Sequence, residues 1–168
     1  MAGDYQEAKA TCHHEAGHII CGITRGVPIK RVSIAPACGK GKAGEATYAE
    51  VGDDFDMLVC TLGGSIAEER FTGRPNEYGA FGDRESVKRL LAKRYGRETK
   101  DADLDAPIVA AAKVEAAKIV TTRWVEIEAL AARLIEKFEI EETEIRAIVG
   151  RAATDRITNQ IAKLEKLT

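Results

Sequence analysis

The sequence predicts a single α+β domain that is mainly helical, with a small β-sheet and a C-terminal helical bundle. Apolar residues recur at spacings of three and four over most of the chain, which is the period of amphipathic helices. Alternation typical of strands is confined to the stretch between residues 29 and 49. A length of 168 residues suits one domain, residues 1–168, with its own hydrophobic core.

Two helices are predicted in the N-terminal half. The first covers about Asp4–Thr24, and Gly26-Val-Pro28 ends it. The second covers about Asp54–Phe71, although Gly63-Gly64 lies in its middle. Two adjacent glycines destabilise a helix interior by roughly 1 kcal/mol each, so we expect them where this helix packs closely against another backbone.

Two strands are predicted between these helices. Ile29–Pro36 alternates, with Val32 and Ile34 on one face, and Glu45–Ala49 is its expected partner. The loop Cys38–Gly44 is rich in Gly and Lys but lacks the GxxxxGK[ST] pattern of a phosphate-binding loop. We therefore expect a mobile hairpin loop and no nucleotide site.

Three further helices are predicted after a loop over Thr72–Gly82. They cover about Arg84–Tyr95, about Pro107–Phe138, and Glu142 to the C terminus. The amphipathic last segment, Arg151–Thr168, is expected to pack on the bundle. The long middle helix carries one apolar stripe that we interpret as core, formed by Val114, Ala117, Val120, Trp124, Ile127, Leu130, Leu134 and Phe138.

Composition argues against several classes of partner. The formal net charge is -2, from 25 basic and 27 acidic residues that are well mixed, so no positive field attracts nucleic acid. No segment reaches the roughly 20 apolar residues of a membrane helix, and the N-terminus lacks a signal-peptide pattern. We expect a cytoplasmic protein without nucleic-acid or membrane partners, whose cysteines are mostly buried thiols.

All three histidines of the chain lie in Cys12-His-His-Glu-Ala-Gly-His18, which contains the motif HExxH. On a helix, residues four apart share a face, so His14 and His18 can bind one metal ion, and imidazole nitrogen suits Zn²⁺. Glu15 then stands beside the ion, where it can take a proton from a zinc-activated water. His13 points about 100° away from His14 and is expected at the surface or behind a ligand.

A catalytic zinc site needs a third protein ligand. Spacing leaves three candidates, which are Glu68, Glu69 and Asp83. Both glutamates lie on the second predicted helix. Asp83 opens the third, where it could equally be a plain N-cap. Residue chemistry alone leaves this choice open.

Several segments resemble, in the same order, the protease domain of the FtsH family, the membrane-anchored ATP-dependent zinc proteases. They are HHEAGHIICGI followed by IKRVSIAP, then LGGSIAEERFTG, then AFGD followed by SVKRLL, and finally the helices from Ala116 onward. The similarity spans about residues 5–150. An ordered set of this length is far more specific than HExxH alone.

The resemblance implies a zincin-like helical domain in which His14, His18 and Asp83 bind zinc and Glu15 is the catalytic base. The metal-site helices and the sheet would occupy about residues 1–83, and the helical bundle with its C-terminal extension about residues 84–168.

The resemblance also implies that one acidic residue of the second helix, Glu68 or Glu69, orients a ligand histidine. Of the two we favour Glu69. In the family a strand edge near the metal receives the extended substrate, which here implies Ile29–Pro36 or Glu45–Ala49.

Two departures from the family shape the functional expectation. Gly82 stands where the family has Asn before the ligand Asp, and the chain has neither an AAA+ ATPase module nor membrane helices. We therefore expect a zinc-dependent endopeptidase, ATP-independent in itself, that cleaves unfolded or flexible polypeptides. Folded substrates would need a separate unfoldase or regulatory protein. The alternative is a non-catalytic or regulatory descendant that binds or cuts one specific partner.

Overall fold

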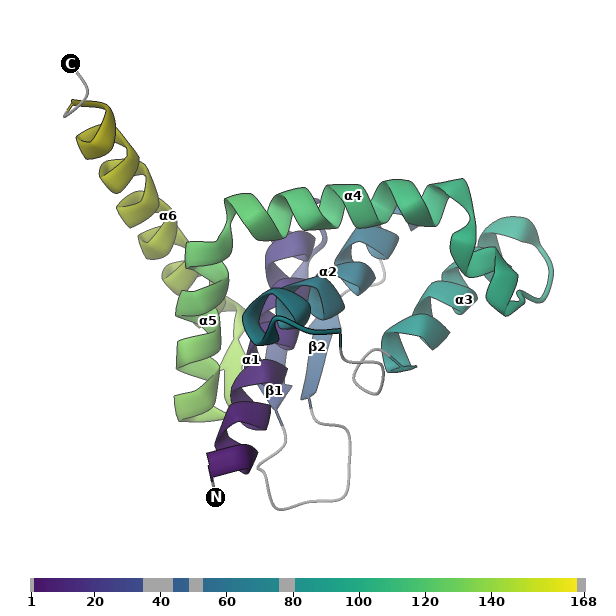
Figure 1. Ribbon diagram of the computed structural model, residues 1–168, viewed down its shortest axis with the longest axis horizontal. Coiled ribbons are helices and arrows are strands. Elements are labelled where there is room, and N and C mark those ends of the chain that lie inside the picture. The colour runs from purple at the N-terminus through teal and green to yellow at the C-terminus, as the bar shows by residue number, and fades with distance from the viewer. Residues whose placement is uncertain (1, 35–43, 49–52, 76–80, 166–168) are drawn as a thin grey trace.

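Helices make up most of the structure, a computed structural model that describes residues 2–34, 44–48, 53–75 and 81–165, and three short strands in these ranges form one sheet (Figure 1). The elements in chain order are α1 (Ala2–Thr24), β1 (Ile29–Ile34), β2 (Gly44–Tyr48), α2 (Asp54–Thr72), α3 (Phe81–Tyr95), the 3-10 helix η1 (Asp101–Asp105), α4 (Pro107–Thr122), α5 (Trp124–Lys137), β3 (Glu139–Glu141) and α6 (Glu142–Glu165). The prediction of a mainly helical α+β fold is confirmed.

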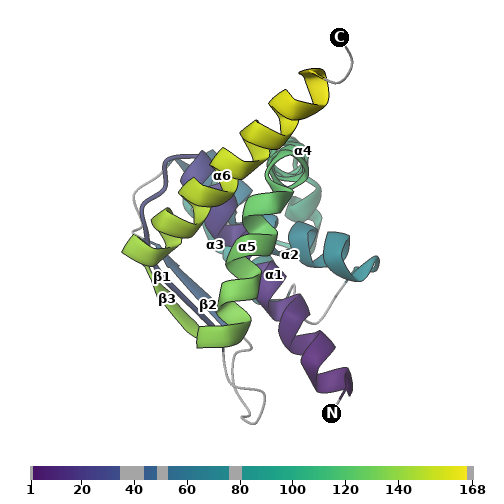
Figure 2. The ribbon, with the colours of Figure 1, turned by 90° about the vertical axis from the view of Figure 1, so that its left-hand side faces the viewer.

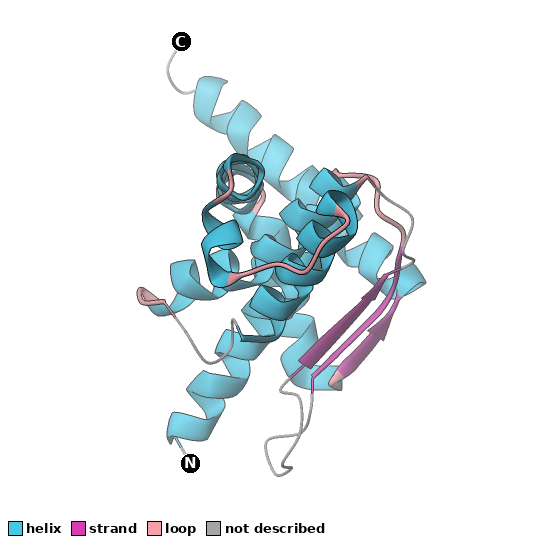
Figure 3. Cartoon of the chain, turned by 90° about the vertical axis from the view of Figure 1, so that its right-hand side faces the viewer, coloured by secondary structure: helices cyan, strands magenta, loops and turns pink. Residues whose placement is uncertain are grey.

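Helix α1 runs through the middle of the molecule, with the sheet on one side and helices on the other (Figures 2 and 3). It contacts α2, α4, α5, β1 and β2. Every residue from 12 to 22 is buried, so this part of the helix faces other parts of the protein all round rather than on one side. The histidines of the chain therefore lie inside the protein.

The three strands are antiparallel in the order β2-β1-β3. Val32 and Ile34 are both buried, as their shared face predicts. The strand β3 was not predicted, because it has only three residues, of which Ile140 alone is buried. The predicted loop at 38–43 and the predicted strand ends at 35–36 and 49 lie outside the described residues.

Helix α2 packs very closely on α1, as its paired glycines predict. A Cβ on Gly63 would lie 2.5 Å from the Cys21 sulfur and 2.8 Å from the Gly17 carbonyl oxygen, and a Cβ on Gly17 would lie 2.6 Å from the Cβ of Ala67. Each distance is shorter than van der Waals contact, so neither Gly17 nor Gly63 could carry a side chain without moving the helices apart. Cys21 is buried, as are the free thiols of Cys12 and Cys60, and burial raises the pKa of the latter two to about 12.

The single long helix predicted over Pro107–Phe138 is wrong, because the chain turns at Arg123 and forms two helices, α4 and α5, that run in clearly different directions (Figure 1). Arg123 leaves helical geometry with φ -115° and ψ 27°. Just before it, the Thr122 hydroxyl donates to the carbonyl oxygens of Lys118 and Ile119 at 2.9 and 3.3 Å. Such hydroxyl bonds compete with the backbone ladder and favour a bend.

The turn also changes which residues of the predicted apolar stripe are buried. In α5 the stripe residues Ile127, Leu130 and Leu134 are fully buried, whereas in α4 Val114 is 71% exposed. Phe138, which ends α5 with a positive φ of 63°, is exposed as well. The stripe is therefore core in α5 but only partly core in α4.

Helix α6 contacts α5, β1 and β3 with its first half, and its second half extends beyond the rest of the molecule (Figure 2). Ala152 is buried and Arg156 donates to the buried Glu126 carboxylate at 3.1 Å, but Ile157 is 51% exposed. Among the described side chains of the segment Arg151–Thr168, the predicted packing on the bundle is therefore seen at Ala152 and Arg156 but not at Ile157.

Candidate metal centre

Helix α1 presents the imidazoles of His14 and His18 side by side, with ring centroids 4.7 Å apart and an interplanar angle of 83°. Each ring is fixed through its Nδ1 atom. His14 Nδ1 lies 2.9 Å from a carboxylate oxygen of Glu68, and His18 Nδ1 lies 2.8 Å from the carbonyl oxygen of Cys60. Because both partners are acceptors, both Nδ1 atoms carry a proton, so the neutral form of each ring has its lone pair on Nε2.

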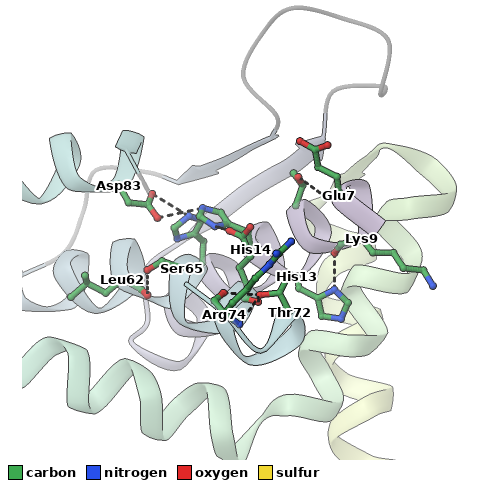
Figure 4. A network of polar contacts seen from close by, with 12 residues as sticks. Glu7, Lys9, His13, His14, Leu62, Ser65, Thr72, Arg74 and Asp83 are labelled. Carbon is green, nitrogen blue, oxygen red and sulfur yellow. Dashed lines mark hydrogen bonds and ion pairs between the residues drawn. The ribbon is translucent and has the colours of Figure 1, made fainter. Parts of the chain in front are cut away.

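Asp83 projects from the first turn of α3 toward these two Nε2 atoms (Figure 4). Its Oδ2 atom lies 3.3 Å from Nε2 of His14, and its Oδ1 atom lies 3.4 Å from Nε2 of His18. One ligand atom from each of the three residues fits within 4.8 Å of the others. Helix α3 begins at Phe81, so Asp83 is not the N-cap that the alternative interpretation required.

The donor set of this cluster fits a divalent cation. The buried Asp83 Oδ2 atom has no hydrogen-bond partner in the ranges of the chain that the structure describes, and the Nε2 atoms of both imidazoles face the same carboxylate. Acceptor groups gathered in this way repel one another unless a proton or a metal ion lies among them. Two imidazole nitrogens and one carboxylate oxygen form a usual three-residue set for Zn²⁺ with a fourth position open.

The pKa shifts within the cluster also indicate a site that favours a cation. Burial lowers the pKa of His14, but its contacts with Asp83 and Glu68 outweigh burial and raise the pKa to about 10. Burial likewise lowers the pKa of His18, and Asp83 reverses the direction and raises it. Burial raises the pKa of Asp83, but the two histidines hold it well below its usual value. The cluster thus stabilises positive charge, which a metal ion would supply in place of protons.

Glu15 follows the first histidine of the cluster and is only 5% exposed. Burial raises the pKa of its carboxyl group, while the neighbouring imidazoles of His18 and His14 lower it, and the net direction is upward. A carboxylate whose pKa is raised toward neutrality is suited to accept and return a proton. Glu15 is outside the three-residue ligand group, consistent with the predicted position beside the ion.

Gly64 provides the space in which the two imidazoles lie. A Cβ at this position would overlap the ring of His18 and would lie 2.9 Å from Nε2 of His14. The second glycine of the predicted close contact therefore faces the candidate metal site, while Gly63 faces the α1 backbone. Sequence analysis expected close packing here but did not connect Gly64 with the ligands.

The acid that contacts a histidine of the cluster, His14, is Glu68, so the preference for Glu69 was wrong. Glu68 is buried and Glu69 is exposed. Helix periodicity could have separated them, because Cys60, Gly64 and Glu68 are spaced by four and share the face of α2 that meets α1. Glu69 is about 100° further round the helix.

His13 does not belong to the cluster, as expected from its direction, but it is buried rather than at the surface. Its Nδ1 donates to the Lys9 carbonyl oxygen at 2.7 Å, on the opposite side of α1 from Asp83 (Figure 4). Its ring stacks on Phe71 at 3.8 Å between centroids, with Trp124 at 5.6 Å. His13 therefore joins α1 to α2 and α5.

No family model matches the chain, and no curated protein matches it significantly. Among the described residues, no helix combines the length and apolarity that crossing a membrane requires. The similarity to the FtsH protease domain accordingly rests on the sequence segments quoted above, and the case for a metal rests on the geometry of His14, His18 and Asp83.

Proposed function

We propose that the protein is a zinc-dependent metallopeptidase that hydrolyses peptide bonds of unfolded or flexible polypeptides. The observation that carries the proposal is the convergence of His14, His18 and Asp83 within 4.8 Å, from two helices far apart in sequence, with Glu15 buried alongside. A purely structural metal site could use Glu68, which holds an imidazole in place, but it would not need Glu15, which is outside the three-residue cluster.

Zinc is the metal that this donor set favours. Two neutral imidazoles and a single carboxylate suit Zn²⁺, whereas Ca²⁺ and Mg²⁺ prefer sites made of oxygen ligands. His14, His18 and Asp83 would hold the ion, and Glu68 and the Cys60 carbonyl would fix the imidazoles. When bound, zinc supplies a Lewis acid that polarises a carbonyl group and acidifies water.

Glu15 performs the proton transfers in the proposed reaction. Its carboxylate accepts a proton from the water that attacks the peptide carbonyl carbon. As the C–N bond breaks, the same carboxyl group returns the proton to the leaving amine nitrogen. Burial raises the pKa of this carboxyl group, which favours its acting first as a base and then as an acid.

The sheet offers one edge for an extended polypeptide beside Glu15. Of the two strands predicted as the edge, β1 is paired on both sides and cannot accept another strand. Within the described part of the chain, β2 forms the end of the sheet that contacts α1. Strand addition to β2 would therefore align a substrate near the site. Hydrolysis of a peptide bond by an activated water consumes no nucleotide, so the proposed reaction is ATP-independent in itself.

The test is cleavage of a fluorescently labelled, unfolded polypeptide by the zinc-loaded protein and two variants, with zinc content measured for each. We expect the wild type to cleave, Glu15→Gln to keep its zinc and lose turnover by at least about 100-fold, and Asp83→Ala to lose zinc. A wild type that holds zinc and cleaves no polypeptide would refute the enzymatic proposal and leave a binding protein.

A further inference from the structure

Gly44 begins the edge strand β2, and here the strand backbone lies directly against the Glu15 carboxylate. We propose that Gly44 is a positioning residue for Glu15, because the absence of a side chain at residue 44 lets β2 hold the carboxylate beside the two imidazoles. This inference rests on the proposed function, since it concerns the group to which we assign the proton transfers.

The geometry leaves no room for a side chain at residue 44. A Cβ built there would lie 2.5 Å from Oε1, 2.7 Å from Cγ and 2.8 Å from Cδ of Glu15. All three distances are well inside van der Waals contact. The Glu15 carboxylate therefore packs against the backbone of β2 at Gly44, on the side of Glu15 that faces the sheet.

A larger residue at position 44 would displace Glu15 rather than the strand. The pairing of Gly44 with Ile34 fixes β2 to β1, and the Ile34 amide donates to the Phe138 carbonyl oxygen at 2.8 Å. Backbone held by a sheet moves less easily than the far end of a glutamate side chain, which has three rotatable bonds. The expected consequence is a misplaced base in a protein that still folds.

Alanine substitutions at three glycines can distinguish an effect on the position of Glu15 from an effect on the metal site. The three atoms nearest to a Cβ on Gly44 all belong to Glu15, whereas those nearest to a Cβ on Gly64 belong to the imidazoles of His18 and His14. A Cβ on Gly150, in α6, meets no atom within 4 Å. Gly44→Ala therefore tests the base, Gly64→Ala tests the two imidazoles, and Gly150→Ala is a control that should affect neither.

The first experiment measures zinc content, kcat and KM on an unfolded polypeptide for Gly44→Ala, Gly64→Ala and Gly150→Ala. For Gly44→Ala we expect wild-type zinc content, a KM within about threefold and a kcat reduced at least about tenfold. Gly64→Ala should lose zinc, and Gly150→Ala should match the wild type. A Gly44→Ala protein with kcat within twofold of the wild type, with zinc lost, or unable to fold would overturn the proposal.

A second comparison asks whether Gly44 acts through Glu15. In a Glu15→Gln background the residual turnover should be unchanged by Gly44→Ala, since a positioning residue has no effect once its target is removed. A further tenfold loss in the double variant would show that Gly44 acts on something else.

The third readout does not depend on turnover, so it separates failure of this inference from failure of the proposed function. The Glu15 carboxyl carbon can be observed by NMR in zinc-loaded protein and assigned by its absence from Glu15→Gln. We expect its resonance to move in Gly44→Ala and to stay in Gly150→Ala. An unmoved resonance would refute the positioning role even if the protein proves to be inactive as a peptidase.

Discussion

At the scale of single residues, Glu68 and Glu69 show that a shift of one position along a helix determines whether a side chain reaches the candidate metal site. They have the same side chain and adjacent numbers, but only Glu68 faces α1 and contacts His14. A carboxylate that accepts the Nδ1 proton fixes the tautomer and the orientation of the ring, and makes Nε2 a better ligand.

We therefore expect Glu68→Gln to weaken zinc binding by about 10- to 100-fold, because the charged partner of His14 is lost. Glu69→Gln is the matched control, since it changes an exposed residue of the same helix. Competition with a fluorescent zinc chelator measures both affinities. Equal affinities in the two variants would show that the contact with His14 does not matter for the metal.

At the scale of elements, the candidate site joins α1, which is packed firmly in the molecule, to α3, which has few buried contacts. Helix α1 is buried along its middle, whereas α3 buries only Val87 and Leu91 and contacts α2 and η1. Asp83 in α3 nevertheless completes the cluster. A bound metal would therefore contribute more to the attachment of α3 than to that of α1.

This inequality predicts a local effect of metal removal. Stripping zinc with a chelator should speed amide hydrogen exchange in α3 by about tenfold or more, because few apolar contacts hold it in place. Exchange in the middle of α1 should change much less. Mass spectrometry of peptides from the two helices measures the difference, and equal changes in both would contradict a special role of the metal for α3.

In the second half of α6, Arg156 contacts a buried charge of α5. Glu126 is fully buried, and its Oε1 atom accepts from Arg123 at 3.3 Å and from Arg156 at 3.1 Å. Removing Arg156 would leave the buried carboxylate with a weaker set of donors. Such a group costs stability unless it is well hydrogen-bonded.

We expect Arg156→Ala to lower the free energy of unfolding by about 1–3 kcal/mol. Arg151→Ala, an exposed arginine of the same helix, should stay within about 0.5 kcal/mol of the wild type. Urea denaturation followed by circular dichroism measures both. Equal stabilities would mean that solvent satisfies Glu126 in place of Arg156.

At the scale of the whole molecule, the sequence could predict the features that depend on local periodicity, such as which residues share one face of a helix. Helix geometry correctly predicts that His14 and His18 share one face of α1 and that another backbone approaches closely at Gly63, whereas Gly64 meets imidazole rings instead. The meeting of Asp83 with the histidines could only be left open, because the contact joins segments about 65 residues apart and depends on how α3 lies on α2.

Features fixed by tertiary contacts were missed. The turn at Arg123 has no Gly or Pro to mark it, and β3 is too short to alternate. The bond from His18 to the Cys60 carbonyl involves a backbone atom, which any residue could supply. Such features depend on which surfaces meet, and single-sequence patterns contain little information about that.

The central claim is that two imidazoles and one distant carboxylate bind a zinc ion, and X-ray absorption at the zinc edge tests it most directly. We expect one equivalent of zinc with nitrogen and oxygen neighbours at about 2.0–2.1 Å, imidazole scattering from two rings, and fewer protein ligands in Asp83→Ala. A protein that takes up no zinc, or zinc with sulfur neighbours at about 2.3 Å, would contradict the account.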